Sequence, residues 1–286
     1  MMQLQTHVEI PHAPFEIAPC ARMLFVGSCF ADNMGRRFAE DRFRVTANPY
    51  GVMYNAVSIG HTLCRVVDEA APADDYSVAV LTLGTNHIYL LNETGEVVDN
   101  CQKRPQRLFT EQQMTVAETV ESLVSSILML RERWPQLRVV LTVSPIRYRK
   151  YGYHGSQLSK ATLLLAADEV TRRVPEVYYF PAYEIMNDEL RDYRFYKEDM
   201  LHPTDQAVEY IWQRFADAYF GDDTWQYLRE WQPVKEALGH RPLHPDSEAY
   251  RQFMDKTLSR ARQLSKKYPN FALYLSAFDS NPVNYL

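Results

Sequence analysis

A serine stands near the start of the chain where an apolar segment gives way to an amphipathic one. Residues 23–26 are apolar, Gly27-Ser28 follows, and apolar residues then recur at helical spacing up to residue 39. This pattern predicts a buried strand that delivers Ser28 to the amino end of a helix. The unpaired N–H groups and the positive dipole of that helix end suit a developing oxyanion. Ser28 is therefore our candidate nucleophile for acyl transfer, and the alternative is a serine that only ends a strand.

The next residue, Cys29, could also be a nucleophile, because the amino end of a helix favours a thiolate. We expect its side chain to point away from that of Ser28 and to fill the core. The sequence thus predicts serine rather than thiol chemistry at this junction.

A carboxylate and an imidazole, Asp199 and His202, lie three positions apart just before another predicted helix. A turn at this spacing can bring the carboxylate onto the ring and fix the tautomer that accepts a proton. Because a catalytic triad is defined by geometry and not by chain order, these residues can serve Ser28 as orienting acid and base. His87 is a rival base, which we interpret instead as a substrate contact or a hairpin residue.

Several ordered blocks resemble the GSCFA family, which is named for its Gly-Ser-Cys-Phe-Ala motif, and through it the SGNH (GDSL-type) hydrolases. The blocks are Gly27-Ser28-Cys29-Phe30-Ala31, Asn48-Pro49-Tyr50-Gly51, Thr82-Leu83-Gly84-Thr85, Thr142-Val143-Ser144-Pro145, Ser159-Lys160-Ala161, Tyr179-Phe180-Pro181-Ala182-Tyr183-Glu184 and Asp199-Met200-Leu201-His202-Pro203. The resemblance implies a Ser28–His202–Asp199 triad. It also implies an oxyanion hole built from the N–H of Ser28, the N–H of Gly51 and the side-chain amide of Asn86. The alternatives are that Gly51 is a turn glycine and that Asn86 caps a loop.

A loop after the fourth predicted strand, residues 144–155, is rich in cationic and aromatic side chains. Such side chains suit a sugar face or an anionic substrate, although a solvated loop with scattered tyrosines would look similar. The predicted substrate-binding residues are His87, Arg147, Tyr148, Tyr151 and Tyr153. Sequences of the GSCFA family tend to have His and Asp at the positions of Tyr148 and Tyr151, so the resemblance implies that this chain acts on a different substrate or lacks activity.

Strand and helix patterns alternate along the first two thirds of the chain, which predicts a three-layer α/β/α sandwich with a parallel central sheet. Strands are expected at 22–27, 43–47, 77–83, 137–143 and 177–180, with a hairpin at 88–99. Helices are expected at 32–41, 55–67, 156–174 and 204–219, and a capping box at Thr115 and Glu118 predicts the start of another long helix. Residues 1–220 would form this SGNH-like domain, and residues 221–286 a helical C-terminal extension packed on it.

Composition and charge limit the kinds of partner. The net charge of −5 argues against a nucleic-acid binder, and the four cysteines form no CxxC pair, so they are read as reduced. The sequence shows no metal-ligand cluster and no glycine-rich phosphate loop, and it implies no cofactor. The N-terminal residues do not resemble a secretory signal, and no apolar run is long enough to span a membrane. We therefore expect a cytoplasmic protein of unknown oligomeric state.

Together these features predict a serine-dependent ester hydrolase that removes an O-acyl group, such as acetyl, from a saccharide or related small molecule. An acyltransferase with the same triad is one alternative. A non-catalytic carbohydrate-binding protein that retains the fold is another.

Overall fold

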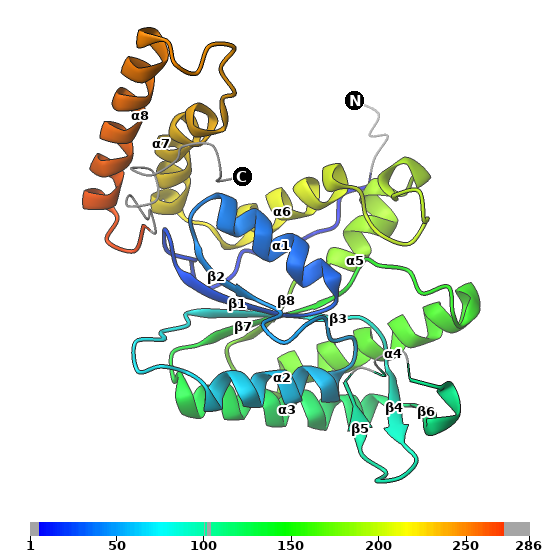
Figure 1. Cartoon of the computed structure of the whole chain (residues 1–286). Coiled ribbons are helices and arrows are strands. Elements are labelled where there is room, and N and C mark those ends of the chain that lie inside the picture. Colours follow the sequence, from blue (N-terminus) through cyan, green and yellow to red (C-terminus); the bar gives the residue numbers. More distant parts are fainter. Residues whose placement is uncertain (1–5, 100, 102–103, 272–286) are drawn as a thin grey trace.

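The structure is a computed structural model that describes residues 6–99, 101 and 104–271. Its centre is a parallel sheet of five strands in the order β2-β1-β3-β7-β8 (Figure 1). The strands are β1 (Arg22–Gly27), β2 (Arg44–Ala47), β3 (Val78–Leu83), β7 (Arg138–Val143) and β8 (Val177–Tyr179). Strand β1 pairs with β2 on one side and with β3 on the other, so it is internal.

Helices cover both faces of the sheet, which confirms the predicted three-layer α/β/α architecture. One face is covered by α1 (Cys29–Glu40) and α6 (Asp205–Tyr219), and the other by α2 (Ala56–Asp68), α3 (Val116–Arg133) and α4 (Gly152–Arg173). Successive strand residues point to opposite faces. Met23 and Phe25 of β1 accordingly pack in the α1–α6 layer, while Leu24 packs in the α2–α3–α4 layer.

A small antiparallel sheet lies beside the main one, in the order β5-β4-β6. Its strands are β4 (His87–Leu91), β5 (Val97–Val98) and β6 (Phe109–Gln113). The sequence predicts the hairpin of β4 and β5 but not β6, because Phe109 is the only apolar residue of that mostly polar strand. The capping box predicted at Thr115 and Glu118 is present and begins α3. Helix α4 begins at Gly152, four residues before the predicted start.

Short helical turns lie between the other described elements before α6. They are η1 (Gln106–Leu108), α5 (Ala182–Glu184), the π-helical η2 (Ile185–Leu190) and η3 (Tyr193–Phe195). The loop that carries Asp199 and His202 runs from η3 to the start of α6, where Thr204 caps the helix.

The C-terminal helices are α7 (Asp222–Gly239) and α8 (Glu248–Lys267), which form a hairpin at one end of the sandwich (Figure 1). Tyr227 of α7 donates a hydrogen bond to the carbonyl of Asp41 (2.6 Å), and Trp231 donates to the carbonyl of Glu40 (3.2 Å). These contacts lie at the carboxyl end of α1. Helix α1 is about 18 Å long at 1.5 Å per residue, so α7 packs far from Cys29 at its amino end.

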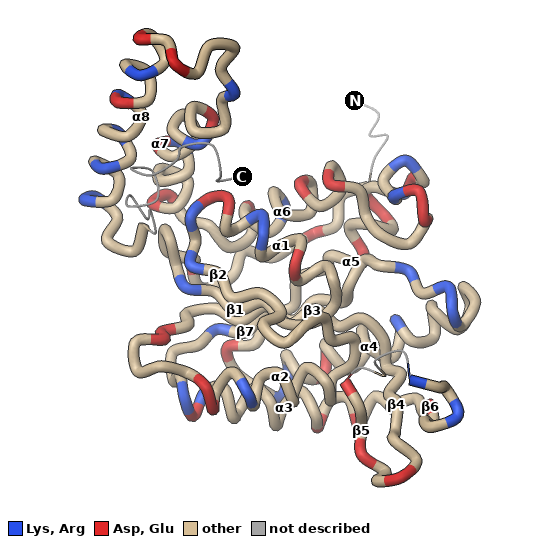
Figure 2. Tube along the Cα trace, viewed as in Figure 1, with Lys and Arg blue, Asp and Glu red and all other residues tan. Residues whose placement is uncertain are grey.

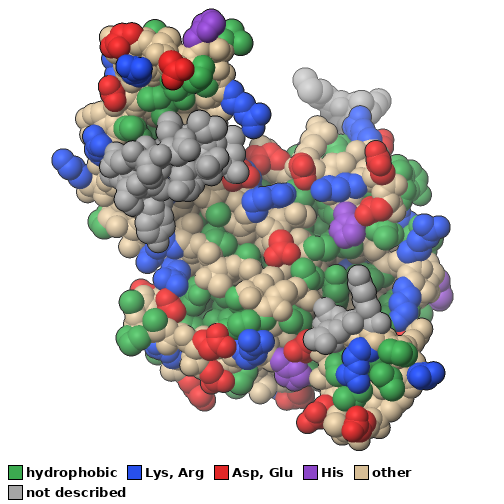
Figure 3. Space-filling model, viewed as in Figure 1, with side chains coloured by type: hydrophobic (Ala, Val, Ile, Leu, Met, Phe, Trp, Pro, Cys, Tyr) green, Lys and Arg blue, Asp and Glu red, His purple; other side chains and the backbone are tan. Residues whose placement is uncertain are grey.

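Charged residues of both signs are interspersed along the chain, in the sandwich and in the C-terminal hairpin alike (Figure 2). The space-filling view likewise shows scattered Lys and Arg side chains rather than one continuous basic area on that face (Figure 3). Among the described helices, none combines the length and the apolar character needed to cross a bilayer.

Candidate active site

The carboxyl ends of the parallel strands bring the predicted segments together at one edge of the sheet. The N–H of Ser28 donates to the carbonyl of Thr82 (3.0 Å), and the N–H of Ser144 donates to the carbonyl of Leu83 (2.8 Å). The side chain of Asn48 accepts a hydrogen bond from the N–H of Gly27 (2.8 Å). The loops after β1, β2, β3 and β7 therefore meet at one edge of the sheet, which is the edge where ligands bind in open α/β sheets.

Gly27 allows the turn from β1 to α1. Its φ is +140°, and a Cβ at this position would lie 2.2 Å from the carbonyl oxygen of Thr82. Both the conformation and the close approach of the neighbouring strand therefore require glycine.

Asp199 and His202 form the pair that their spacing predicts. The Asp199 Oδ2 atom lies 2.5 Å from His202 Nδ1, while Oδ1 accepts hydrogen bonds from the N–H groups of Leu201 (2.8 Å) and His202 (3.0 Å). These backbone donors, with the imidazole, lower the pKa of Asp199 to about 2, so its carboxylate is ionised at neutral pH. The pair leaves Nε2 of His202 as the free ring nitrogen, and 39% of the His202 side chain is exposed.

Backbone contacts hold the loop of this pair against the sheet edge. The N–H of Arg147 donates to the carbonyl of Leu201 (3.1 Å), which joins the loop to the segment after β7. The N–H of Lys197 donates to the carbonyl of His202 (2.8 Å), so the loop closes on itself. The carboxylate and imidazole are thus placed by the backbone and not only by each other.

The side chain of Ser28, our predicted nucleophile, points into the protein. Ser28 is fully buried, and its Oγ lies 3.1 Å from Thr82 Oγ1 and 2.9 Å from Ser144 Oγ. The same oxygen accepts a hydrogen bond from the N–H of Phe30 (3.2 Å) and so caps α1. Within the described residues, no hydrogen bond joins Ser28 to Asp199 or His202. This geometry does not support attack by Ser28, because its hydroxyl is inaccessible and its hydrogen bonds are used for capping and packing.

The three predicted oxyanion donors are also engaged elsewhere. The N–H of Ser28 donates to Thr82, as described above, and the N–H of Gly51 donates to the carbonyl of Asn48 (2.9 Å) in a turn. The side-chain amide of Asn86 donates to the carbonyl of Met114 (2.8 Å). Gly51 thus follows its alternative interpretation as a turn glycine. Asn86 uses one of its two amide N–H groups to hold a loop, as its alternative interpretation has it.

Cys29, which we expected to be core filler, is the first residue of α1; it packs against the core of the α1–α6 layer, as expected, but is only partly buried. Its thiol contacts its own N–H, a group that has no partner inside the helix. Burial is the main cause that raises the pKa of the thiol to about 11, and the negative charges of Asp32 and Asp199 raise it further. The charge of Asp199 therefore acts on Cys29.

A buried lysine, Lys160 of the Ser159-Lys160-Ala161 block, lies behind this junction, although the sequence assigned it no role in the site. Lys160 of α4 is 1% exposed, and its amine donates to the carbonyls of Gly84 and Ser144, both at 2.8 Å. Burial lowers the pKa of Lys160 to about 7. The signal in the sequence is a lysine on the apolar face of a predicted helix. The amine ties the loop after β3 to the loop after β7.

Tyr148, predicted to bind substrate, lies in the wall of the same region. Its ring meets that of Tyr54 edge to face, with centroids 5.8 Å apart. Its hydroxyl lies close to Gly84, where a side-chain Cβ would come within 2.8 Å of it. This hydroxyl is buried and has no hydrogen-bond partner among the described residues. The electrostatic influence of Cys29 contributes to a raised pKa of Tyr148, which is caused chiefly by burial.

Two other predicted substrate contacts, His87 and Tyr151, instead pack against each other. Their rings stack with centroids 3.6 Å apart and an interplanar angle of 7°. Glu111 of β6 accepts hydrogen bonds from the hydroxyl of Tyr151 and from Lys150, and its carboxylate lies 3.2 Å from His87 Nδ1. Only 6% of His87 is exposed. This cluster joins the small sheet to the loop before α4, and its burial makes His87 a poor rival base.

The remaining predicted contacts, Arg147 and Tyr153, lie beside the Asp199–His202 loop. The Arg147 guanidinium carbon is 4.3 Å from the ring centroid of Tyr153 and 5.3 Å from that of Tyr196. Tyr153 and Tyr193 are 51% and 68% exposed, so their rings present aromatic surface to solvent. These residues can contact a ligand bound near His202.

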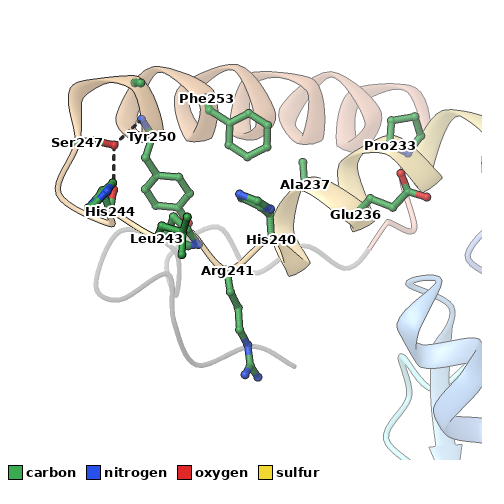
Figure 4. A pocket seen from close by; sticks show the side chains of 12 residues that line it. Pro233, Glu236, Ala237, His240, Arg241, Leu243, His244, Ser247, Tyr250 and Phe253 are labelled. Carbon is green, nitrogen blue, oxygen red and sulfur yellow. Dashed lines mark hydrogen bonds between the residues drawn. The ribbon is translucent and has the colours of Figure 1, made fainter.

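A large groove of the molecule lies elsewhere, between α7 and α8 (Figure 4). It encloses about 680 Å³ and is lined by Leu243, Tyr250 and Phe253, with His240 edge to face against Phe253. None of the edge residues described above lines it. In the described part of the chain, no group of three or more His, Cys, Asp or Glu side chains is arranged to hold a metal ion.

Comparison with protein families identifies the chain. The model of the GSCFA family matches residues 22–78 and 71–215, which together cover more than half of the sequence. The chain belongs to the GSCFA family. The model of the GSCFA domain protein C-terminal domain also matches, over residues 231–274, which include α8 and part of α7. No curated protein sequence matches this GSCFA chain.

Solved structures that match this chain have low sequence identity to it. A carbohydrate esterase family 3 protein from Talaromyces cellulolyticus is 10% identical, with a TM-score of 0.44 over 69% of the GSCFA chain and 95% of its own. A member of the lipolytic protein G-D-S-L family from Veillonella parvula is 14% identical, with a TM-score of 0.44 over 70% and 98%. An acetyl-xylooligosaccharide esterase from Geobacillus is 12% identical, with a TM-score of 0.43 over 71% and 96%. Similarity at this level does not assign a substrate to the GSCFA chain.

Proposed function

We propose that this GSCFA protein hydrolyses esters, with His202 as the general base and Asp199 as its orienting carboxylate. The observation that carries the proposal is the 2.5 Å contact between Asp199 Oδ2 and His202 Nδ1, in a half-exposed loop at the carboxyl edge of the sheet. An ionised carboxylate on Nδ1 makes Nε2 the proton acceptor and stabilises the imidazolium that forms. The amino end of α1, where nucleophile and oxyanion donors are expected, lies at the same edge.

We further propose a small acylated saccharide as the substrate class. The exposed rings of Tyr153 and Tyr193 flank Arg147, whose backbone is bonded to the Asp199–His202 loop. Aromatic faces beside a planar cation suit the apolar face and the hydroxyl groups of a sugar ring. An O-acetyl group is the simplest acyl group that such a substrate could present to His202.

The test is hydrolysis of p-nitrophenyl acetate by the wild-type protein and two variants, followed by release of acetate from acetylated xylo-oligosaccharides. We expect activity in the wild type and a loss of at least about 10³-fold in His202→Ala, as for bases of catalytic triads. The matched control is His61→Ala. His61, on α2, pairs with Asp99 at 2.8 Å, and its side chain is about as exposed as that of His202, but it does not lie in the Asp199–His202 loop.

Equal activity in the wild type and His202→Ala would refute the role of His202. No hydrolysis of any ester, together with measurable binding of the oligosaccharide, would support the alternative of a carbohydrate-binding protein. Replacement of Arg147 by methionine should weaken the oligosaccharide reaction more than that of p-nitrophenyl acetate, which lacks a sugar.

A further inference from the structure

We infer that the nucleophile of this site is Cys29, and that Ser28 is the residue that positions it. This inference rests on the proposed ester hydrolysis and names the atom that attacks. Two adjacent residues follow β1, and they differ in exposure. Ser28 is fully buried while Cys29 is partly exposed.

The hydrogen bonds of Ser28 explain this division of roles. Its Oγ is held by Thr82, by Ser144 and by the N–H of Phe30, which together fix the first turn of α1. A side chain held in three directions in the interior cannot rotate toward a substrate without leaving buried polar groups unpaired. Its capping function instead fixes the direction of the next residue, Cys29.

The loop of the base lies at the same edge as Cys29. The segment after β7 bonds to both, because Ser144 contacts Ser28, the residue before Cys29 (2.9 Å), and Arg147 donates to the carbonyl of Leu201 in the loop (3.1 Å). The charge of Asp199 accordingly helps to raise the pKa of the thiol, which is raised chiefly by burial. A thiol with a raised pKa is protonated at rest, so attack needs a base such as His202 Nε2 to take the proton. Cys29 is therefore not an isolated reactive cysteine but one member of a group that includes Asp199 and His202.

Two donors near the thiol can hold an oxyanion. The N–H of Cys29 lies in the first turn of α1, where a helix supplies no carbonyl partner, and it contacts only its own sulfur. The buried hydroxyl of Tyr148 has no partner among the described residues. An unpaired buried hydroxyl is costly, and it gains a hydrogen bond when an anionic oxygen forms beside it. We assign the oxyanion to these two groups, because the N–H of Gly51 and one N–H of the Asn86 amide already donate to backbone carbonyls.

The reaction then has two balanced steps. In the first, the sulfur of Cys29 attacks the carbonyl carbon of the ester as its proton passes to His202. The tetrahedral intermediate collapses, the bond between carbon and the alcohol oxygen breaks, and the alcohol leaves with the proton from His202. In the second, His202 takes a proton from water as the water oxygen attacks the thioester carbon. The carbon–sulfur bond then breaks to release the acid, and the sulfur takes the proton from His202 to restore the thiol.

The experiment measures p-nitrophenyl acetate hydrolysis and the chemistry of the acyl-enzyme. We expect Cys29→Ala to lose at least about 10³-fold in activity and Ser28→Ala to keep at least about a tenth of it per folded molecule. Cys64→Ala, which removes an exposed cysteine on α2, is the control and should be unchanged. Acid-quenched wild-type protein should carry its acetyl group on Cys29, and neutral hydroxylamine should remove it because thioesters react under conditions that oxyesters resist.

Two outcomes would refute this inference and leave the proposed ester hydrolysis intact. One is activity that survives in Cys29→Ala but not in His202→Ala. The other is an acetyl group on the Ser28 oxygen that is stable to neutral hydroxylamine, a result that would exclude Cys29 as nucleophile even if Ser28→Ala did not fold. Lack of hydrolysis by the wild type would refute both.

Discussion

The buried amine of Lys160 should make the stability of the protein depend on pH in an unusual direction. Its pKa is lowered from 10.5 to about 7 by burial. Between these values the unfolded chain binds a proton that the folded chain does not. Because stability rises with pH wherever the unfolded state binds more protons, Lys160 should make the free energy of unfolding increase from pH 7 upward, and this increase should end near the unfolded pKa.

The magnitude follows from the two pKa values. Each pKa unit corresponds to about 1.4 kcal/mol, and half-protonation of folded Lys160 at pH 7 reduces the slope there. The contribution of Lys160 should therefore raise the free energy of unfolding by roughly 2 kcal/mol between pH 7 and pH 9. Other groups titrate in the same range, so the quantity to measure is the difference between wild type and Lys160→Met.

Urea denaturation at pH 7, 8 and 9 measures this difference. The methionine also removes the hydrogen bonds to Gly84 and Ser144, which changes the difference by an amount that should not vary with pH. Lys256→Met, at an exposed position of α8, is the control and should give a constant difference. A constant difference for Lys160→Met as well would show that the amine stays protonated in the folded protein up to pH 9, and would refute the reasoning.

Three further changes test the placement of the site. Asp199→Asn should lower the turnover of p-nitrophenyl acetate by roughly 10³- to 10⁴-fold, because the His202 ring loses its tautomer partner, and an unchanged rate would exclude this role. Tyr227→Phe should destabilise the protein by about 1–3 kcal/mol in urea denaturation, since the buried carbonyl of Asp41 loses its donor, but leave activity per folded molecule unchanged. Gly27→Ala should reduce the yield of folded protein severely, because its Cβ would meet the backbone of β3, and a stable, active variant would contradict the geometry described.

Much of the fold could be predicted from local patterns. The strand at Arg22–Gly27, the capping box at Thr115 and the alternation of strands and helices depend on the sequence within a few turns of each element. Strand β6 could not be predicted in the same way, because its five residues carry one buried apolar side chain and pair only after β4 has formed. The cluster of His87, Glu111 and Tyr151 depends on that pairing and on a loop forty residues away.

The sequence by itself determined the Asp199–His202 pair and the strand-to-helix junction at Gly27, since both are built from neighbouring residues. Only the tertiary structure decided which side chain of that junction is fully buried and which stays partly exposed. Consecutive residues at the start of a helix point in different directions, and which direction is the interior depends on the strands that pack there. Thr82 of β3 and Ser144, directly after β7, receive the Ser28 hydroxyl, so Ser28 becomes the buried cap and Cys29 the accessible residue. Those partners lie 54 and 116 positions away, beyond the reach of any local pattern.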